Sequence, residues 1–80
     1  MKTIVLTHKA ARELDAVPRP ARQAIGQALN AYAVTGRGDV KKISVREGYG
    51  MRVGNYRIVF AEDATTILAI YVGRRSTTTY

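Results

Sequence analysis

Hydrophobic residues in the first half of this chain are spaced first as in a strand and then as in helices. Residues 3–6 are apolar or β-branched, which predicts a short strand, and the Thr7 hydroxyl can cap a helix that follows it. Pro18 and Pro20 interrupt that helix, because the residue before a proline is pushed out of the helical region. A second helix is expected from about Pro20 to a stop at Gly36. Its apolar stripe comprises Ala21, Ile25, Ala28, Leu29, Tyr32 and Ala33.

From Val40 onward the pattern alternates with the period of a β-strand. The segment that begins at Val40 mixes polar and apolar residues on both of its sides, which is typical of an edge strand. A turn is expected at Glu47-Gly48. Residues 49–53 and 56–61 then flank Gly54-Asn55, and a two-residue loop of this kind predicts a β-hairpin.

The short loop of this hairpin also predicts its register. Counting outward from the loop pairs Val53 with Tyr56 and Arg52 with Arg57. Alternate side chains point to opposite faces, so one face of the hairpin is apolar or aromatic and is expected to pack on the helices. That face comprises Tyr49, Met51, Val53, Tyr56, Ile58 and Phe60. The two arginines lie on the other face.

Residues 66–72 form an almost unbroken apolar run near the end of the chain. Such a run predicts a central strand that is either covered from both sides or flanked by neighbouring strands. The elements together predict a single α+β domain over residues 1–80. In this fold an N-terminal strand and a two-helix hairpin pack on one face of a mainly antiparallel sheet of four to five strands.

Composition narrows the chemistry that this domain can perform. The chain has 80 residues with 13 Lys and Arg against 6 Asp and Glu, so its net charge of +7 favours anionic partners. The absence of cysteine and a single histidine, His8, argue against disulfides, a zinc site and a Ser/His/Asp triad, so no metal or cofactor is expected. No apolar run approaches the ~20 residues that span a bilayer, and the N-terminus has no signal pattern. A soluble, cytoplasmic protein without a membrane partner is expected.

Basic residues concentrate between positions 41 and 57, where Glu47 is the one acidic residue. The basic residues of this segment are Lys41, Lys42, Arg46, Arg52 and Arg57. Two arginines that face each other across a hairpin repel by about 0.2–1 kcal/mol, and a bound anion relieves this repulsion.

Arg74 and Arg75 follow the last strand and can join the hairpin pair if the two segments are neighbours in the sheet. Guanidinium groups match phosphate oxygens, so nucleic acid is the favoured ligand class. The alternative is a solvated basic face with Glu47, Glu62 and Asp63 as scattered partners.

Most tyrosines are expected to serve in the core. This interpretation covers Tyr32, Tyr49, Tyr56 and Tyr71, which fall on apolar faces or within the apolar run. Tyr80 differs because it ends a Ser/Thr tail. There it can stack on a base or donate a proton, or it can belong to a frayed terminus.

The hairpin and the end of the last strand resemble the RelE/ParE superfamily of toxins from type II toxin–antitoxin systems. The resemblance rests on residues 49–60, with their Arg-Val-Gly-Asn-Tyr-Arg core, and on Val-Gly-Arg-Arg at 72–75 followed by Tyr80. The two-helix opening and the length also agree. Members of the RelE-like branch cleave mRNA, typically in the ribosomal A site, whereas members of the ParE-like branch poison DNA gyrase on a similar fold.

The resemblance implies roles for individual residues and favours the RelE-like branch. Arg52 matches a basic position before the turn, and Arg57 matches the arginine that contacts the scissile phosphate. Arg75 matches the arginine implicated in stabilising the transition state or protonating the leaving group, and Tyr80 resembles the tyrosine that stacks on the substrate base. The implied reaction is a metal-independent attack of the ribose 2′-OH on phosphorus, by a ribosome-dependent endoribonuclease that a cognate antitoxin neutralises in a hetero-oligomer.

Two positions depart from the pattern of the superfamily. Gly50 stands where the best-known RNases of this branch have a lysine proposed as general base, and Arg74 stands where many relatives have a histidine. Lys41, Lys42 or Arg46 can compensate from the neighbouring strand, or the ribosome can supply part of the site. Two other functions stay open, a gyrase inhibitor and a basic RNA-binding protein without catalysis.

Overall fold

The computed structural model describes residues 1–43 and 48–74. The predicted turn at Glu47 and the candidate residues Arg46, Arg75 and Tyr80 therefore lie outside the described residues. The described elements are β1 (Thr3–Leu6), α1 (His8–Asp15), α2 (Arg19–Thr35), β2 (Val40–Lys42), β3 (Tyr49–Val53), β4 (Tyr56–Glu62) and β5 (Thr66–Arg74).

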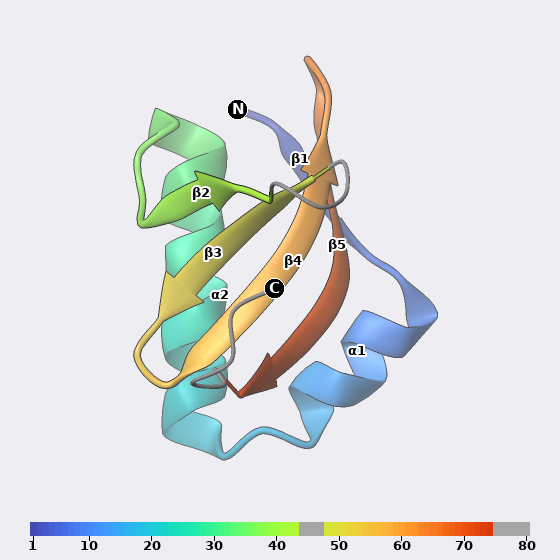
Figure 1. Cartoon of the computed structure of the whole chain (residues 1–80), viewed down its shortest axis with the longest axis vertical. Coiled ribbons are helices and arrows are strands. Elements are labelled where there is room, and N and C mark those ends of the chain that lie inside the picture. The colour runs from blue at the N-terminus through green and yellow to red at the C-terminus, as the bar shows by residue number, and fades with distance from the viewer. Residues whose placement is uncertain (44–47, 75–80) are drawn as a thin grey trace.

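The strands form one five-stranded sheet in the order β1-β5-β4-β3-β2 (Figure 1). β1 runs parallel to β5, and every other neighbouring pair is antiparallel. α2 lies across one face of this sheet, while α1 lies beside β5, beyond the end of β1. The predicted α+β architecture with a mainly antiparallel sheet is confirmed, and the segment after Val40 is an edge strand as expected.

Local sequence signals set the ends of both helices. The Thr7 hydroxyl accepts a hydrogen bond from the Ala10 amide at 3.1 Å and so caps α1. α2 begins at Arg19, with Pro20 in its first turn, where a proline disturbs no helical hydrogen bond. Gly36 ends α2 with φ 74°, a left-handed conformation that glycine adopts without steric cost.

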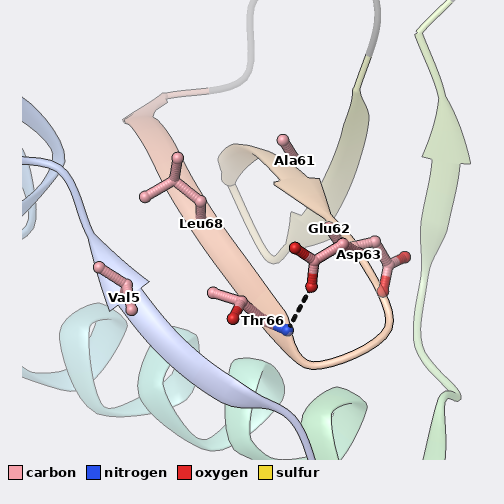
Figure 2. A pocket seen from close by; sticks show the side chains of 6 residues that line it. All are labelled: Val5, Ala61, Glu62, Asp63, Thr66 and Leu68. Carbon is pink, nitrogen blue, oxygen red and sulfur yellow. Dashed lines mark hydrogen bonds between the residues drawn. The ribbon is translucent and has the colours of Figure 1, made fainter.

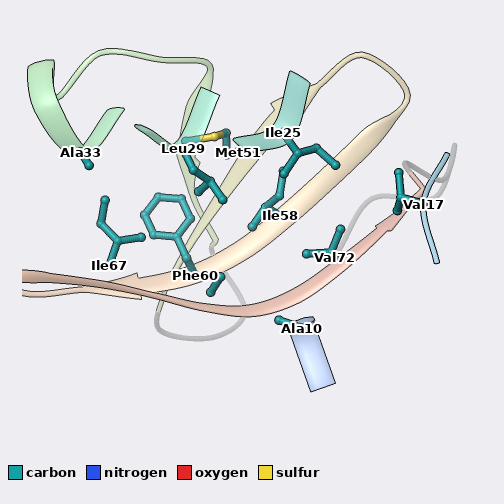
Figure 3. Close-up of a cluster of buried hydrophobic side chains, with 11 residues drawn as sticks. Ala10, Val17, Ile25, Leu29, Ala33, Met51, Ile58, Phe60, Ile67 and Val72 are labelled. Carbon is teal, nitrogen blue, oxygen red and sulfur yellow. The ribbon is translucent and has the colours of Figure 1, made fainter. Parts of the chain in front are cut away.

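The hairpin of β3 and β4 has the predicted register. Val53 pairs with Tyr56, and Arg52 pairs with Arg57 around the turn at Gly54. The face toward α2 is buried, with Phe60 at its centre (Figure 3). The Phe60 ring stacks on Tyr49 at 5.6 Å between centroids and meets the Tyr32 ring edge-on at 5.5 Å. Within the described residues the core cluster comprises Ala10, Val17, Ile25, Leu29, Ala33, Met51, Ile58, Phe60, Ile67, Ala69 and Val72.

β5 is flanked by β1 and β4 but is covered on one face alone. Ile67, Ala69 and Val72 are buried toward the helices, whereas Leu68, Ile70 and Tyr71 are exposed. Of the two situations expected for this apolar run, flanking by neighbouring strands is therefore the one observed. The face of the sheet that points away from α2 is called the outer face below.

A bulge in β5 overturns the predicted core role of Tyr71. Val59 pairs with Tyr71 but the next residue, Phe60, pairs with Ala69, so Ile70 is an extra residue in β5. Simple alternation from Ile67 would turn Tyr71 toward the helices. The extra residue instead places Tyr71 on the outer face, 36% exposed.

Two isoleucines in neighbouring strands test this division between the faces. Ile58→Ala removes a fully buried side chain and is expected to lower the free energy of unfolding by about 2–5 kcal/mol. Ile70→Ala, the same change at a 38% exposed position, is expected to cost less than about 1 kcal/mol. Urea denaturation followed by circular dichroism measures both; equal losses would contradict the described faces.

Candidate functional site

Arg52 and Arg57 lie side by side in the sheet, on the outer face of β3 and β4. Arg52 pairs with Arg57, and Arg57 pairs on its other side with Gly73 of β5. These three residues form one cross-strand row, called the arginine row below. Arg52 is exposed and Arg57 is half-buried. Gly73 has no side chain, and the Tyr71 side chain occupies the space where its Cβ would lie.

Asp39 is a member of this site that sequence reasoning missed. The Arg52 Nε donates to the Asp39 Oδ2 at 2.9 Å, and the Arg52 amide donates to the Asp39 carbonyl at the same distance. Both side chains of the ion pair are 49% exposed, so solvent screens it strongly. The partners proposed from sequence were Glu47, Glu62 and Asp63. The basic segment was counted from position 41, so it did not include Asp39. Asp39 directly precedes β2, and the pairing of β2 with β3 brings it next to Arg52.

Lys41 and Lys42 differ in the face that they occupy. Lys41 pairs with Gly50, so its register position is on the outer face, one row away from the arginines. Lys42 pairs with Tyr49, a residue of the helix side. Both lysines are exposed on the edge strand β2. The structure therefore brings Lys41, but not Lys42, onto the face of the arginine row.

Arg74 also does not join the arginine row, although β5 and the hairpin are neighbours as expected. Arg74 pairs with Tyr56 and is two residues from the buried Val72, which places it on the helix side. It lines an open groove of about 320 Å³ together with Val17 and Tyr56. The predicted gathering of Arg74 with Arg52 and Arg57 is therefore wrong, because one strand position separates the two faces.

A second polar cluster lies at the opposite end of β4, around Glu62. The Lys2 Nζ and the Tyr32 hydroxyl each donate to a different Glu62 carboxylate oxygen at 2.5 Å. Burial acts to raise the pKa of Glu62, but the hydrogen bonds from Lys2 and Tyr32 outweigh it and hold the pKa below its ordinary value. Burial, together with the bond to Glu62, raises the pKa of Tyr32 to about 12. This cluster ties β1 and α2 to β4.

The outer face next to this cluster is apolar and acidic. A shallow cavity of about 310 Å³ there is lined by Val5, Ala61, Glu62, Asp63, Thr66 and Leu68 (Figure 2). The Asp63 carboxylate accepts from the Thr66 amide at 2.8 Å, which closes the turn between β4 and β5. Acidic side chains therefore gather at this end of β4, while the arginine row lies near its other end.

Comparison with solved structures identifies relatives of this fold. Toxin chains of RelB–RelE antitoxin–toxin complexes superpose on it over nearly their whole length. The chain from Methanococcus jannaschii has a TM-score of 0.74 at 26% identity, covering 89% of this chain and 90% of that one. The chain from Pyrococcus horikoshii has a TM-score of 0.81 at 14% identity, with 96% and 98% covered.

A third structure extends the likeness beyond RelE itself. The YoeB dimer from Staphylococcus aureus matches with a TM-score of 0.73 at 19% identity, covering 94% of this chain and 98% of that one. No protein-family model matches the sequence, and no curated protein matches it significantly. The fold is thus the RelE-like toxin fold, which confirms the resemblance seen in the hairpin. Within the described residues, no helix is long and apolar enough to cross a membrane.

The Glu62 cluster predicts how stability depends on pH. Because the pKa of Glu62 is lower in the folded chain, its contribution to stability is present above pH 4.5, the ordinary value, and is lost as the pH falls through the folded value. Glu62→Gln removes this titration. The melting temperature of the variant is expected to lie below that of the wild type at pH 7, with a gap that narrows toward pH 3. The control is Asp15→Asn at an exposed helix position; a constant gap for Glu62→Gln would contradict the linkage.

The ion pair to Asp39 predicts a second effect, on anion binding. Asp39→Asn removes a carboxylate from the arginine row and is expected to tighten binding of a single-stranded RNA oligonucleotide, most strongly at low salt. Asp15→Asn makes the same change of net charge away from the row. Titrations at several salt concentrations measure both affinities, and equal effects of the two variants would show that net charge alone is responsible.

Proposed function

We propose that this protein is the toxin of a type II toxin–antitoxin system and acts as a ribosome-dependent mRNA endoribonuclease. One observation carries the proposal: a fold shared with RelE and YoeB toxin chains places Arg52 and Arg57 together on an exposed face of the sheet. The guanidinium groups can hold a phosphate between them. Among the described residues, Asp39 forms an ion pair with Arg52, and Glu62 lies at the far end of β4.

In the proposed reaction the ribose 2′-oxygen attacks the adjacent phosphorus while the bond from phosphorus to the 5′-oxygen breaks. A base takes the 2′ proton and an acid delivers a proton to the leaving 5′-oxygen, which yields a 2′,3′-cyclic phosphate and a 5′-OH. Arg57 and Arg52 stabilise the negative charge that develops on the phosphoryl oxygens. Arg75 is proposed to assist the leaving group, and Tyr80 to stack on the substrate base.

The best-known RNases of the RelE-like branch have a lysine, proposed as general base, at the position of Gly50. Lys41 is proposed to take the place of that lysine here. It pairs with Gly50 across the β2–β3 ladder, and its register position is on the face of the arginine row. Its long side chain can therefore reach toward the phosphate from the strand next to Gly50. Lys42, Arg46 and Arg74 are proposed to contact RNA phosphates away from the scissile bond.

A cognate antitoxin is the proposed partner in the cytoplasm. The RelE chains that this fold resembles were solved in complexes with RelB antitoxins. An acidic or amphipathic antitoxin segment suits a chain with net charge +7. Bound over the arginine row, such a segment would exclude mRNA and hold the toxin inactive in a hetero-oligomer.

Mapping of 5′ ends on cellular transcripts tests the activity. Induction of the chain alone is expected to arrest growth and to create new 5′-OH ends within translated codons. Arg57→Ala and Arg75→Ala are expected to lower the yield of these ends at least about a hundredfold, because each removes a cation from the developing charge. The matched control is Arg19→Ala, at an exposed position on α2.

Other outcomes would replace the proposal. Growth arrest with blocked supercoiling and intact transcripts would indicate a gyrase inhibitor. Salt-sensitive RNA binding with a log-log slope of about −3 and intact RNA would indicate a binding protein that contacts about four phosphates. Cleavage that persists in Arg57→Ala would overturn the assignment of the site.

A further inference from the structure

The Tyr71 hydroxyl occupies the place that a side chain at Gly73 would fill. Tyr71 and Gly73 are two positions apart on β5, so both lie on the outer face. A Cβ atom added to Gly73 would overlap the hydroxyl oxygen and the Cζ atom of Tyr71. The tyrosine therefore lies along its strand, with its oxygen in the arginine row rather than in its own row. The glycine is what makes this position accessible to a phenol.

This placement brings the hydroxyl next to Arg57. Gly73 is the direct cross-strand partner of Arg57, and Cβ atoms of such partners are about 5 Å apart. An oxygen at the Cβ position of Gly73 therefore lies beside the Arg57 side chain, on the same face of the sheet. Tyr71 remains 36% exposed, so solvent and ligands reach it.

α1 supports the tyrosine from the side. The Lys9 Nζ lies 4.8 Å from the centre of the Tyr71 ring, and Lys9 is itself held by an ion pair with Glu13 at 2.7 Å. Glu13 in turn accepts a hydrogen bond from the Val72 amide at 3.0 Å, next to Tyr71 in β5. The Glu13 contact holds α1 beside β5, and Lys9 of the same helix lies against the Tyr71 ring.

We propose that the Tyr71 hydroxyl donates a hydrogen bond to the phosphate held by the arginine row, which makes Tyr71 a catalytic residue of this site. The inference rests on the proposed function. Arginines supply charge to the phosphoryl oxygens, and a phenol adds a directed donor without adding repulsion between Arg52 and Arg57. The phenol keeps its proton in this role, so Tyr71 is neither the base nor the acid of the reaction.

Four variants of the full chain test this role. Tyr71→Phe removes the oxygen alone, and Tyr49→Phe is the matched control because Tyr49 packs on Phe60 at the helix side. Gly73→Ala drives the ring away from the row, and the fourth variant combines it with Tyr71→Phe. Single-turnover cleavage of mRNA on programmed ribosomes gives the rate. Binding of a 2′-methoxy RNA and the melting temperature report on affinity and folding.

Tyr71→Phe and Gly73→Ala are each expected to lower the cleavage rate about a hundredfold, with little change in melting temperature for Tyr71→Phe. The double variant is expected to lose no more than either single variant, because both act on one hydrogen bond. Tyr49→Phe should cleave as the wild type does.

Arg57→Ala in the same assay distinguishes a failure of the role of Tyr71 from a failure of the proposed function. If Arg57→Ala abolishes cleavage while Tyr71→Phe matches the wild type, the role of Tyr71 is overturned and the proposed function stands. A double variant whose losses multiply would also overturn it. A wild type that leaves RNA intact, or an Arg57→Ala variant that cleaves normally, would overturn the proposed function and the role of Tyr71 with it.

Discussion

The pairing of β3 with β4 is the constraint on which the rest of the structure depends. A two-residue turn at Gly54-Asn55 fixes the register, so Met51 and Ile58 point into the core while Arg52 and Arg57 oppose each other outside. A slip of one residue would bury the arginines and expose the core side chains. The hydrophobic effect therefore enforces a juxtaposition of like charges that the surface alone would not select.

Basic and acidic side chains lie at opposite ends of β4. Arg57 lies near the start of the strand and Glu62 at its end, where Lys2 and Tyr32 bind the carboxylate. The Glu62 cluster links α2 and the residue before β1 to β4, and it involves no residue of the arginine row. In the arginine row, Asp39 forms an ion pair with Arg52, and both of these side chains are about half exposed.

Short-range rules predicted most of the fold and the pairing of Arg52 with Arg57. The Thr7 cap, the Gly36 stop and the hairpin register follow from local sequence, and each is confirmed. Asp39 was missed because its contact with Arg52 depends on the register of β2 on β3, and the turn expected at Glu47-Gly48 did not predict that register.

The remaining errors lie in β5. Its apolar run contains no signal for the extra residue at Ile70, so Tyr71 was interpreted as a core residue of that run and Arg74 as a neighbour of Arg52 and Arg57. The bulge occurs where β1 ends and α1 takes its place beside β5. The bulge therefore coincides with a contact between elements far apart in the sequence. It turns the Tyr71 side chain to the outer face, beside Arg57.

The most direct test of RNA binding at the arginine row is to locate the residues of the sheet that RNA contacts. An NMR titration of the labelled chain with a short 2′-methoxy RNA, which cannot be cleaved, reports this residue by residue. If RNA binds at the arginine row, the largest amide shift changes are expected at Arg52, Arg57 and Gly73, with little change around Glu62 and Thr66. Shifts that gather instead on α2 or around the cavity beside Asp63 would contradict it.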